Sequence, residues 1–286
     1  MSLPKPIVVL GAEGQLGAEL CRQLGERAVG LGRHQCDLLE PDRVAEVLKR
    51  LQPLVVINTA AYTAVDRAEQ EPALCHAMNA DAVAALASLC RELDSTLVQI
   101  STDYVFGADL SRQVPYAETD APGAINVYGQ SKLAGERHAA AWKKHLVVRT
   151  CGLYGRRKQS APSNFVETML RLARERDRLR IVDDQRCTPS YVIHVARAIV
   201  FLSESNARGI YHVTCDGEAT WHEFATEIFR LARLSPQVDR ISTAEYAVAA
   251  SRPLYSVLAT SKYQATAGAA LPHWKAAIAE YMQTIA

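Results

Sequence analysis

The sequence has few of the features that mark secreted, membrane or metal-binding proteins. Its seven cysteines contain no C-x-x-C pair, which favours free thiols in a cytoplasmic protein over a disulfide framework. Its eight histidines show no H-E-x-x-H or similar spacing, so we expect no metal site. No apolar run approaches the roughly 20 residues that span a bilayer, and residues 1–6 lack the features of a signal peptide. We therefore expect a cytoplasmic location and no membrane contact.

The chain also lacks an excess of either charge. Its 32 Lys and Arg residues almost balance 31 Asp and Glu residues. Proteins that bind nucleic acid usually carry a basic surface, so we expect no nucleic-acid partner. With 286 residues, 49% of them hydrophobic, the chain is long enough for one large α/β domain and a smaller lobe.

Apolar runs alternate with helical patterns through the first half of the chain. We expect strands at 7–10, 29–31, 55–58, 97–101 and 146–149, and helices at 18–24, 41–51, 72–93 and 128–142. Unbroken apolar strands between helices predict a parallel sheet that is covered on both faces. Right-handed crossovers then give a doubly wound α/β fold of the Rossmann type, with its ligand at the carboxyl ends of the strands.

The pattern becomes looser after residue 149. We expect helices at 164–176, 192–202, 221–231 and 274–285, and a strand at 209–213. These elements predict a smaller C-terminal α/β lobe that binds substrate. The expected dinucleotide-binding domain comprises residues 1–154 and 187–214, and the expected substrate lobe comprises residues 155–186 and 215–286.

Residues 7–17 read Ile-Val-Val-Leu-Gly-Ala-Glu-Gly-Gln-Leu-Gly, a strand-like run that leads into a G-x-x-G-x-x-G turn. Because Gly11 and Gly14 have no Cβ, backbone N–H groups at the start of the next helix can approach a pyrophosphate. Gly17 allows that helix to pack closely on the strand. A plain tight turn is the alternative interpretation, but the position between strand and helix favours a dinucleotide site.

A Tyr-x-x-x-Lys pair places both side chains on one face of a helix. Tyr128 and Lys132 begin an expected helix, whereas Tyr154 and Lys158 have no helix to align them, and we interpret that second pair as coincidence. The Lys132 ammonium is expected to lower the pKa of Tyr128 from its usual value of about 10 and to prepare the phenol for proton transfer.

A hydroxyl at the carboxyl end of strand 97–101 completes the expected catalytic group. Thr102 is the candidate that hydrogen-bonds a substrate carbonyl, and Ser101 is the second candidate. The non-catalytic interpretation of Ser101-Thr102-Asp103 is a turn that ends the strand.

These motifs resemble the dTDP-4-dehydrorhamnose reductase family of extended short-chain dehydrogenase/reductases. The matching segments are Gly-Ala-Glu-Gly-Gln-Leu-Gly (11–17), Val-Ile-Asn-Thr-Ala-Ala-Tyr-Thr-Ala-Val-Asp-Arg-Ala-Glu (56–69), Ser-Thr-Asp-Tyr-Val-Phe (101–106), Tyr-Gly-Gln-Ser-Lys-Leu-Ala-Gly-Glu (128–136), Asn-Phe-Val-Glu-Thr-Met-Leu-Arg-Leu-Ala (164–173), and Arg252-Pro253 with Ser256 and Leu258. The resemblance implies reduction of a nucleotide-linked 4-keto-6-deoxy sugar, most closely dTDP-4-dehydro-L-rhamnose to dTDP-L-rhamnose.

On the pattern of that family, Tyr128 would protonate the C4 oxygen, Lys132 would tune Tyr128, and Thr102 would orient the carbonyl. The expected cofactor contacts are Gly11, Gly14, Gln15, Leu16, Arg33, Asp37, Leu38, Ala60, Ala61, Tyr62, Tyr128 and Lys132. The expected substrate contacts are Val65, Tyr104 and Arg252. Arg252 is suited to a diphosphate, and a surface arginine beside a turn is the alternative.

The cofactor preference follows from the end of the second expected strand. The segment Gly-Leu-Gly-Arg-His (30–34) has no acid before Asp37. An acid at this place binds the ribose of NAD, whereas an arginine suits the 2′-phosphate of NADP. We therefore expect NADPH, with Arg33 at its phosphate and NADH as the alternative cofactor; an exposed arginine without a ligand is the competing interpretation.

Two departures from the family leave the identity of the sugar open. Related reductases usually carry Arg-Thr-Ser-Trp-Val-Tyr-Gly where residues 149–155 read Arg-Thr-Cys-Gly-Leu-Tyr-Gly, so Gly152 replaces a tryptophan. Cys187 and Ser190 replace the usual Gly and Thr. The alternative functions are another nucleotide-sugar reductase or epimerase, and a non-enzymatic NADP-binding regulatory subunit like that of methionine adenosyltransferase. A homodimer is a further expectation, and the need for a divalent ion stays open.

Overall fold

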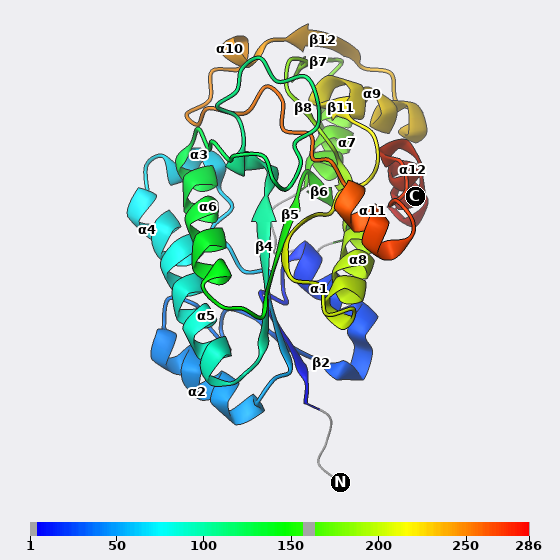
Figure 1. Ribbon diagram of the computed structural model, residues 1–286. Helices are drawn as coiled ribbons and strands as arrows, with labels where there is room; N and C mark the ends of the chain where they lie inside the picture. The colour runs from blue at the N-terminus through cyan, green and yellow to red at the C-terminus, as the bar shows by residue number, and fades with distance from the viewer. Residues whose placement is uncertain (1–4, 157–163, 286) are drawn as a thin grey trace.

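The computed structural model describes residues 5–156 and 164–285, which fold around one parallel β-sheet (Figure 1). Its strands are β1 (Ile7–Leu10), β2 (Ala28–Leu31), β3 (Val55–Asn58), β4 (Thr96–Thr102), β5 (His145–Thr150) and β10 (Gly209–His212). They lie in the order β10-β5-β4-β3-β1-β2, with every neighbouring pair parallel. The chain order reverses between β1 and β3, which is where ligands bind in folds of this kind.

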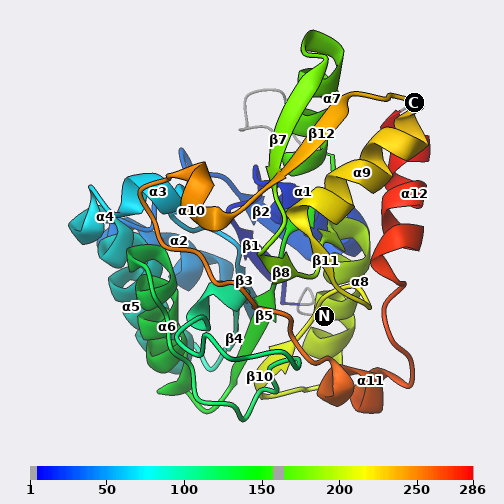
Figure 2. The same cartoon turned by 90° about the horizontal axis from the view of Figure 1, so that it is seen from above.

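Helices cover both faces of this sheet, as the sequence predicted. One face carries α1 (Gln15–Leu24) and α8 (Val192–Glu204). The other carries α2 (Pro41–Leu51), α5 (Ala82–Glu92) and α6 (Val127–Ala140), and Figures 1 and 2 show the two layers. Because β1, β3 and β4 are buried along their whole length, their side chains fill a core on each face.

A second core forms beyond the carboxyl ends of the strands. It packs α7 (Phe165–Glu175), α9 (Trp221–Ala232) and α12 (Trp274–Ile285) against the parallel pair β7 (Arg178–Val182) and β12 (Gln237–Ile241). The sequence did not predict this pair. The division into two lobes stays a prediction. By its position in the chain α11 (Ser261–Ala267) belongs to the expected substrate lobe, but its Tyr263 packs into the core between the central sheet and the helices α1 and α8.

Shorter elements connect these layers. They are η1 (Gly25–Arg27), α3 (Val65–Ala68), α4 (Pro72–His76), η2 (Ala77–Asp81), η3 (Asp103–Val105), β6 (Leu153–Tyr154), β8 (Arg186–Cys187), β9 (Ser190–Tyr191), β11 (Ala219–Thr220) and α10 (Thr243–Tyr246). β6 pairs with β9, and β8 pairs with β11.

The helical stretch α4–η2–α5, Pro72–Glu92, is long and apolar enough to cross a membrane by length and composition alone. The sequence analysis did not expect any segment of this kind. Half of its most apolar window is buried inside the structure. Val83, Leu86 and Cys90 of this stretch join the core on the sheet face that carries α2, α5 and α6. A buried core helix passes the same test of length and composition as a membrane span.

Candidate active site

The turn between β1 and α1 brings two stretches of backbone into close contact. Gly11 has a φ of +74°, and a Cβ there would lie 2.7 Å from the nitrogen of Ala60. A Cβ at Gly17 would overlap the Gly11 carbonyl oxygen. Gly14 precedes α1, and the nearest atom to a Cβ there is 3.4 Å away. The fold therefore requires the first and third glycines, whereas Gly14 leaves the start of the helix open to a ligand.

A cavity of about 690 Å³ extends from this turn across the carboxyl ends of the central strands. Its size and position are those of a ligand groove in a parallel α/β sheet. The expected cofactor residues that line it are Gly11, Gly14, Gln15, Leu16, Arg33, Asp37, Leu38, Ala60, Ala61, Tyr128 and Lys132. Cys36, Thr59, Met78, Thr150 and Leu153 also line it and were not foreseen.

Tyr62 differs from the other expected cofactor residues. It is not among the residues that line the groove, and its hydroxyl donates to Glu71 at 2.7 Å. Its backbone N–H donates to the side chain of Asn79 at 2.9 Å. Its role at the cofactor stays a prediction.

Arg33 follows β2 and lines the groove. Its side chain is 70% exposed, and Nε donates to Asp37 at 2.9 Å. Burial alone would raise the pKa of Asp37, but the Leu39 N–H and the Arg33 guanidinium hold it below its ordinary value. The guanidinium is thus oriented by a carboxylate and remains accessible to an anion.

The start of α6 packs against the segment that follows β4. Asn126 accepts the Gly129 N–H at 2.7 Å and so caps the helix. A Cβ at Gly129 would overlap the carbonyl oxygen of Tyr104. This close approach places the Tyr128 phenol beside the Thr102 hydroxyl, which acts to lower the pKa of that phenol. The structure therefore brings together the tyrosine and the threonine that the sequence singled out.

Lys132 lies one helical turn beyond Tyr128 and is buried. Its Nζ donates to the carbonyl oxygen of Ile100 at 2.6 Å. Burial lowers the pKa of Lys132 to about 8, although the nearby carboxylate of Glu136 acts in the opposite direction. The side chain therefore holds a proton that it can lose at a moderately alkaline pH.

Glu136 is itself part of a buried network. Arg149 binds its carboxylate through two bonds of 2.8 and 2.7 Å, and both side chains are almost fully buried. Ser101, the second candidate for the carbonyl contact, donates its hydroxyl to Glu136 at 2.6 Å. Burial and the Arg149 charge lower the pKa of His212, which lies 3.3 Å from that guanidinium, to about 3. His212 is therefore neutral. Because Ser101 donates its hydrogen to Glu136, that hydrogen is directed away from Tyr128.

The pKa of Tyr128 corrects one sequence-based expectation. Burial raises that pKa above its ordinary value, and the neighbouring Thr102 hydroxyl opposes the rise. The expected lowering by Lys132 is therefore not found in this structure, because burial disfavours the phenolate more strongly. The phenol keeps its proton at neutral pH, and this suits a group that donates a proton.

Asp103 is a site residue that the sequence analysis quoted only as part of a turn. It is buried, and its Oδ2 accepts the Ser256 hydroxyl at 2.6 Å and the Cys151 thiol at 3.0 Å. Its Oδ1 lies 3.1 Å from the Thr102 hydroxyl. Burial raises the pKa of Asp103. Ser256 lies 153 positions further along the chain, so no local pattern could have indicated this cluster.

A second cavity, of about 200 Å³, meets the groove at the candidate side chains Thr102 and Tyr128. Thr102, Asp103 and Tyr128 line both cavities. Two of the expected substrate residues, Val65 and Tyr104, line the second one. Further lining residues, which the sequence analysis did not foresee, are Thr63, Gln185, Arg186, Cys187, Trp221, Pro253 and Ser256.

Arg252 lies beside this cavity without lining it. Its guanidinium binds Asp66 through two bonds of 3.0 and 2.7 Å, and its side chain is only 16% exposed. It is therefore not the surface arginine of the alternative interpretation. Its contact with substrate stays a prediction.

Gly152 lies in the wall that the two cavities share. Its φ is +54°, and a Cβ there would lie 3.1 Å from the Cα of Pro189. A large side chain therefore does not fit this backbone without strain. The indole of Trp221 lines the second cavity from α9, where its N–H donates to Gln185 at 3.2 Å.

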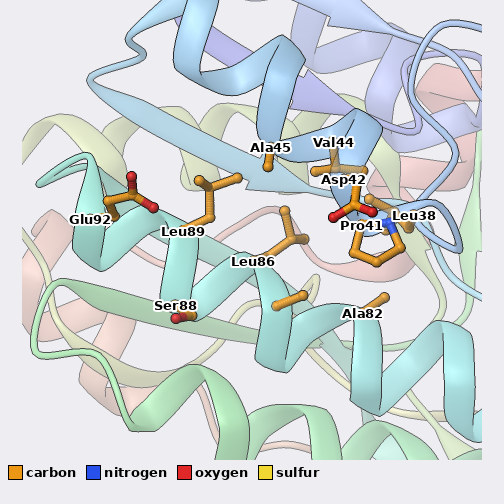
Figure 3. Close-up of a pocket in the computed structure, with 11 residues that line it drawn as sticks. Leu38, Pro41, Asp42, Val44, Ala45, Ala82, Leu86, Ser88, Leu89 and Glu92 are labelled. Carbon is orange, nitrogen blue, oxygen red and sulfur yellow. The ribbon is translucent and has the colours of Figure 1, made fainter.

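A third cavity, of about 210 Å³, lies between α2 and α5 (Figure 3). It is lined by Leu38, Pro41, Asp42, Val44, Ala45, Ala82, Ala85, Leu86, Ser88, Leu89 and Glu92. Asp42 and Glu92 lie at opposite ends of the row, and apolar side chains lie between them. The carboxylates do not converge, so this cavity offers no catalytic arrangement.

Two sequence observations lie outside the site. Tyr154 of the second Tyr-x-x-x-Lys pair is buried in β6 and stacks on Tyr191, whereas Lys158 lies outside the described residues. Among residues 5–156 and 164–285, no group of three or more His, Cys, Asp or Glu side chains is placed to hold a metal ion.

Comparisons with known proteins place this geometry in a family. Residues 5–286 match the family model described as the RmlD substrate binding domain. The chain is 37% identical to a dTDP-4-dehydrorhamnose reductase of Salmonella typhimurium (94% of each chain covered), and 39% identical to one of Streptomyces griseus (97% of this chain and 93% of the other). The crystal structure of a dTDP-4-dehydrorhamnose reductase from Bacillus anthracis in complex with NADP is similar, with a TM-score of 0.93 and 34% identity over 99% of this chain and 100% of the other.

Proposed function

Because the chain belongs to the family of the RmlD substrate binding domain, we propose that it reduces dTDP-4-dehydro-L-rhamnose to dTDP-L-rhamnose with NADPH. The observation that carries this proposal is the junction of the two cavities. A groove of the size and place of a dinucleotide site meets a smaller cavity at Thr102 and Tyr128, and Lys132 lines the groove beside them. A redox cofactor and a keto-sugar can therefore approach the same proton donor from two sides.

The groove suits the cofactor at both of its ends. The open helix start at Gly14 fits the pyrophosphate, and the exposed guanidinium of Arg33 fits a 2′-phosphate. At the other end, Lys132 and Tyr128 would hold the nicotinamide ribose. Bound NADPH supplies the hydride that the ketone carbon accepts.

The protein contributes the proton and its control. Tyr128 would donate its proton to the C4 oxygen, and its raised pKa keeps that proton in place until the oxygen gains negative charge. The ammonium of Lys132 would stabilise the phenolate that remains. Thr102 would hydrogen-bond the carbonyl oxygen and so fix the distance over which the proton moves.

The smaller cavity would hold the sugar and the start of the nucleotide. Val65 and Tyr104 line it, and Arg252 would bind the diphosphate from beside it, with the Asp66 carboxylate holding its guanidinium in place. We add Gln185 and Trp221 to the substrate contacts because both line this cavity. Gly152 leaves room beside the sugar.

The proposal includes the cellular setting. The seven cysteines are free thiols, which fits a reducing cytoplasm. A homodimer is also part of the proposal, and light scattering of the purified protein tests it.

The test is an assay of NADPH oxidation with several keto-sugars. We expect turnover with dTDP-4-dehydro-L-rhamnose, generated in situ, and dTDP-L-rhamnose as the product by chromatography and NMR. A matched reaction with the UDP-linked keto-sugar checks the nucleotide. NADPH binding without turnover of any keto-sugar would contradict the proposal and favour a regulatory protein. Product formation without net NADPH loss would indicate an epimerase.

A further inference from the structure

The Asp103 carboxyl takes no part in the proposed transfer of hydride and proton. Its carboxyl is buried at the junction of the two cavities, and both of its oxygens are occupied. Oδ2 lies 2.6 Å from the Ser256 hydroxyl and 3.0 Å from the Cys151 thiol. Oδ1 lies 3.1 Å from the Thr102 hydroxyl. The distances to Ser256 and Thr102 each join two oxygens. Among the described residues Asp103 is the only partner of the Ser256 hydroxyl, so Ser256 donates, whereas either oxygen can be the donor in the bond with Thr102.

The surroundings of this carboxyl disfavour a negative charge. Its donors are two hydroxyls, a thiol and its own backbone N–H, all neutral, and a thiol is a weak donor. Burial raises the pKa of the neighbouring phenols of Tyr104 and Tyr128 and of the Cys151 thiol. The cations that line the same cavities have other partners. Lys132 donates to the Ile100 carbonyl, Arg186 pairs with Glu218, and Arg33 pairs with Asp37. Burial raises the pKa of Asp103 as well. A carboxyl in an apolar site can stay neutral at pH 7 and donate a hydrogen bond.

The protonation state of Asp103 decides where the hydrogens at the active site are directed. The Thr102 hydroxyl has one hydrogen and can accept two hydrogen bonds. One acceptor position takes the Tyr104 N–H at 3.2 Å. If Asp103 were ionised, the Thr102 hydrogen would be directed at Oδ1, and the Tyr128 phenol would donate to Thr102. The Thr102 hydrogen would then not be available to a ketone, and Thr102 would compete with the ketone for the hydrogen of Tyr128.

A neutral Asp103 reverses the bond with Thr102 and leaves Thr102 with no acceptor position for Tyr128. Ser256 and Cys151 occupy Oδ2, so the acid proton belongs on Oδ1, from which it donates to Thr102. Thr102 then accepts two bonds, from Asp103 and from the Tyr104 N–H. Its own hydrogen becomes available to the ketone oxygen, and the hydrogen of Tyr128 is no longer held by Thr102.

We propose that Asp103 is a neutral carboxylic acid whose Oδ1–H donates to Thr102 and thereby directs the hydroxyl hydrogens of Thr102 and Tyr128 at the substrate ketone. Asp103 is a positioning residue that acts through Thr102. The inference deepens the proposed ketone reduction and rests on it. No proton leaves Asp103: the ketone carbon gains hydride from the cofactor, the oxygen gains the proton of Tyr128, and the acid stays neutral.

Asn and Leu at this position separate the proposal from a structural role. In Asp103→Asn, the amide N–H can take the place of the acid O–H toward Thr102, while the amide oxygen accepts Ser256 and Cys151. We expect its kcat to stay within about threefold of the native value. Asp103→Leu has no donor for Thr102, so we expect its kcat to fall by about 10²-fold with little change in KM. A kcat that falls equally in both variants would overturn the proposal.

A second measurement reads the proton directly and does not depend on turnover. Aspartate labelled with ¹³C at the carboxyl group is introduced into the whole protein, and the signal that is missing in Asp103→Asn is assigned to Asp103. We expect that signal to report a protonated acid through neutral pH. In Cys151→Ser, a stronger donor to Oδ2 favours the carboxylate, so ionisation should begin at a lower pH. A carboxylate signal at neutral pH in the native protein would overturn the proposal.

The two measurements also separate this inference from the proposed function. If the native protein reduces no keto-sugar but its Asp103 signal is that of a neutral acid, the proposed function fails and the neutral acid stands. If the native protein reduces the dTDP-sugar and Asp103 is ionised, the reverse holds. Circular dichroism and NADPH binding confirm that the Leu variant is folded before its kcat is read.

Discussion

Lys132 illustrates how the site depends on single side chains. A buried ammonium is unfavourable, and its pKa is lowered to about 8. Its charge is maintained by Glu136, which Arg149 and Ser101 hold in place. As the pH rises, the loss of the Lys132 proton should therefore lower the activity and raise the stability of the fold. The two effects can be measured separately.

The first prediction concerns this pH dependence. We expect kcat/KM to fall above about pH 8 as Lys132 loses its proton. Because the pKa of Lys132 is lower in the folded state than its ordinary value of 10.5, charging this group costs stability below pH 8, and that cost is relieved between pH 8 and 10.5. Lys132→Arg, which stays charged, should lose this alkaline fall while having lower activity. A native kcat/KM that is constant to pH 10 would contradict the prediction.

Some of the residues of the candidate site could be predicted from the sequence, and others could not. Thr102, Tyr128 and Lys132 were found because a short spacing on one helix and a strand end place them together. Asp103 with Ser256, and Asp66 with Arg252, were not found because each pair joins segments more than 150 positions apart. The raised pKa of Tyr128 was missed because burial is a property of the folded chain.

Among the secondary-structure elements, the turn between β1 and α1 contains one glycine that the packing of the fold requires and another that a ligand requires. A Cβ at Gly17 would overlap the Gly11 carbonyl oxygen, whereas a Cβ at Gly14 would make an ordinary contact with that oxygen at 3.4 Å. A methyl group at either position therefore tests a different property of the same turn.

The second prediction compares Gly17→Ala with Gly14→Ala. The first variant overpacks the turn and should lower the free energy of unfolding by about 1–3 kcal/mol. The second should lower the free energy of unfolding by only about 0.5–1 kcal/mol, because Ala is a poorer N-cap residue than Gly but meets no close contact here. It should nevertheless weaken NADPH binding by about tenfold or more, because the methyl group lies where the pyrophosphate approaches. Thermal unfolding and calorimetric titration measure both. Equal losses of stability in the two variants would contradict this account.

The elements of the sheet were predictable, and the second pair of strands was not. β1, β3 and β5 are continuous apolar runs between helices, which is the pattern of a buried parallel strand. β7 reads Arg-Leu-Arg-Ile-Val and alternates between exposed and buried residues. That alternation was visible, but its partner β12 lies about 60 residues away and is only partly buried, so the pairing left no local pattern.

At the scale of the whole molecule, a late segment of the chain closes the site that the early segments build. Residues 251–256 return to α6 and β4: Asn126 donates to the Ser251 carbonyl at 2.7 Å, and Ser256 binds Asp103. Arg252 in the same segment pairs with Asp66. The second cavity therefore forms only when residues 251–256 are folded against the earlier segments.

The third prediction tests this closure. Asp66→Ala should lower stability by about 1–3 kcal/mol, because it leaves the largely buried guanidinium of Arg252 without its carboxylate. It should raise the KM for the dTDP-sugar by roughly tenfold, since Arg252 is no longer held for the diphosphate, while the Kd of NADPH is unchanged. Glu204→Ala is the matched control, because it breaks the exposed pair with Arg27. An unchanged KM in Asp66→Ala would show that Arg252 does not bind substrate.

The most direct test of the central claim is the rate of NADPH oxidation with dTDP-4-dehydro-L-rhamnose, compared between the native protein and Tyr128→Phe. The account predicts turnover to dTDP-L-rhamnose by the native protein and a loss of about 10²- to 10⁴-fold in the variant, with NADPH binding preserved, because only the proton donor is removed. A Phe variant that retains the native rate would contradict the assignment of Tyr128 as the acid, and a native protein that binds NADPH without turnover would contradict the enzyme itself.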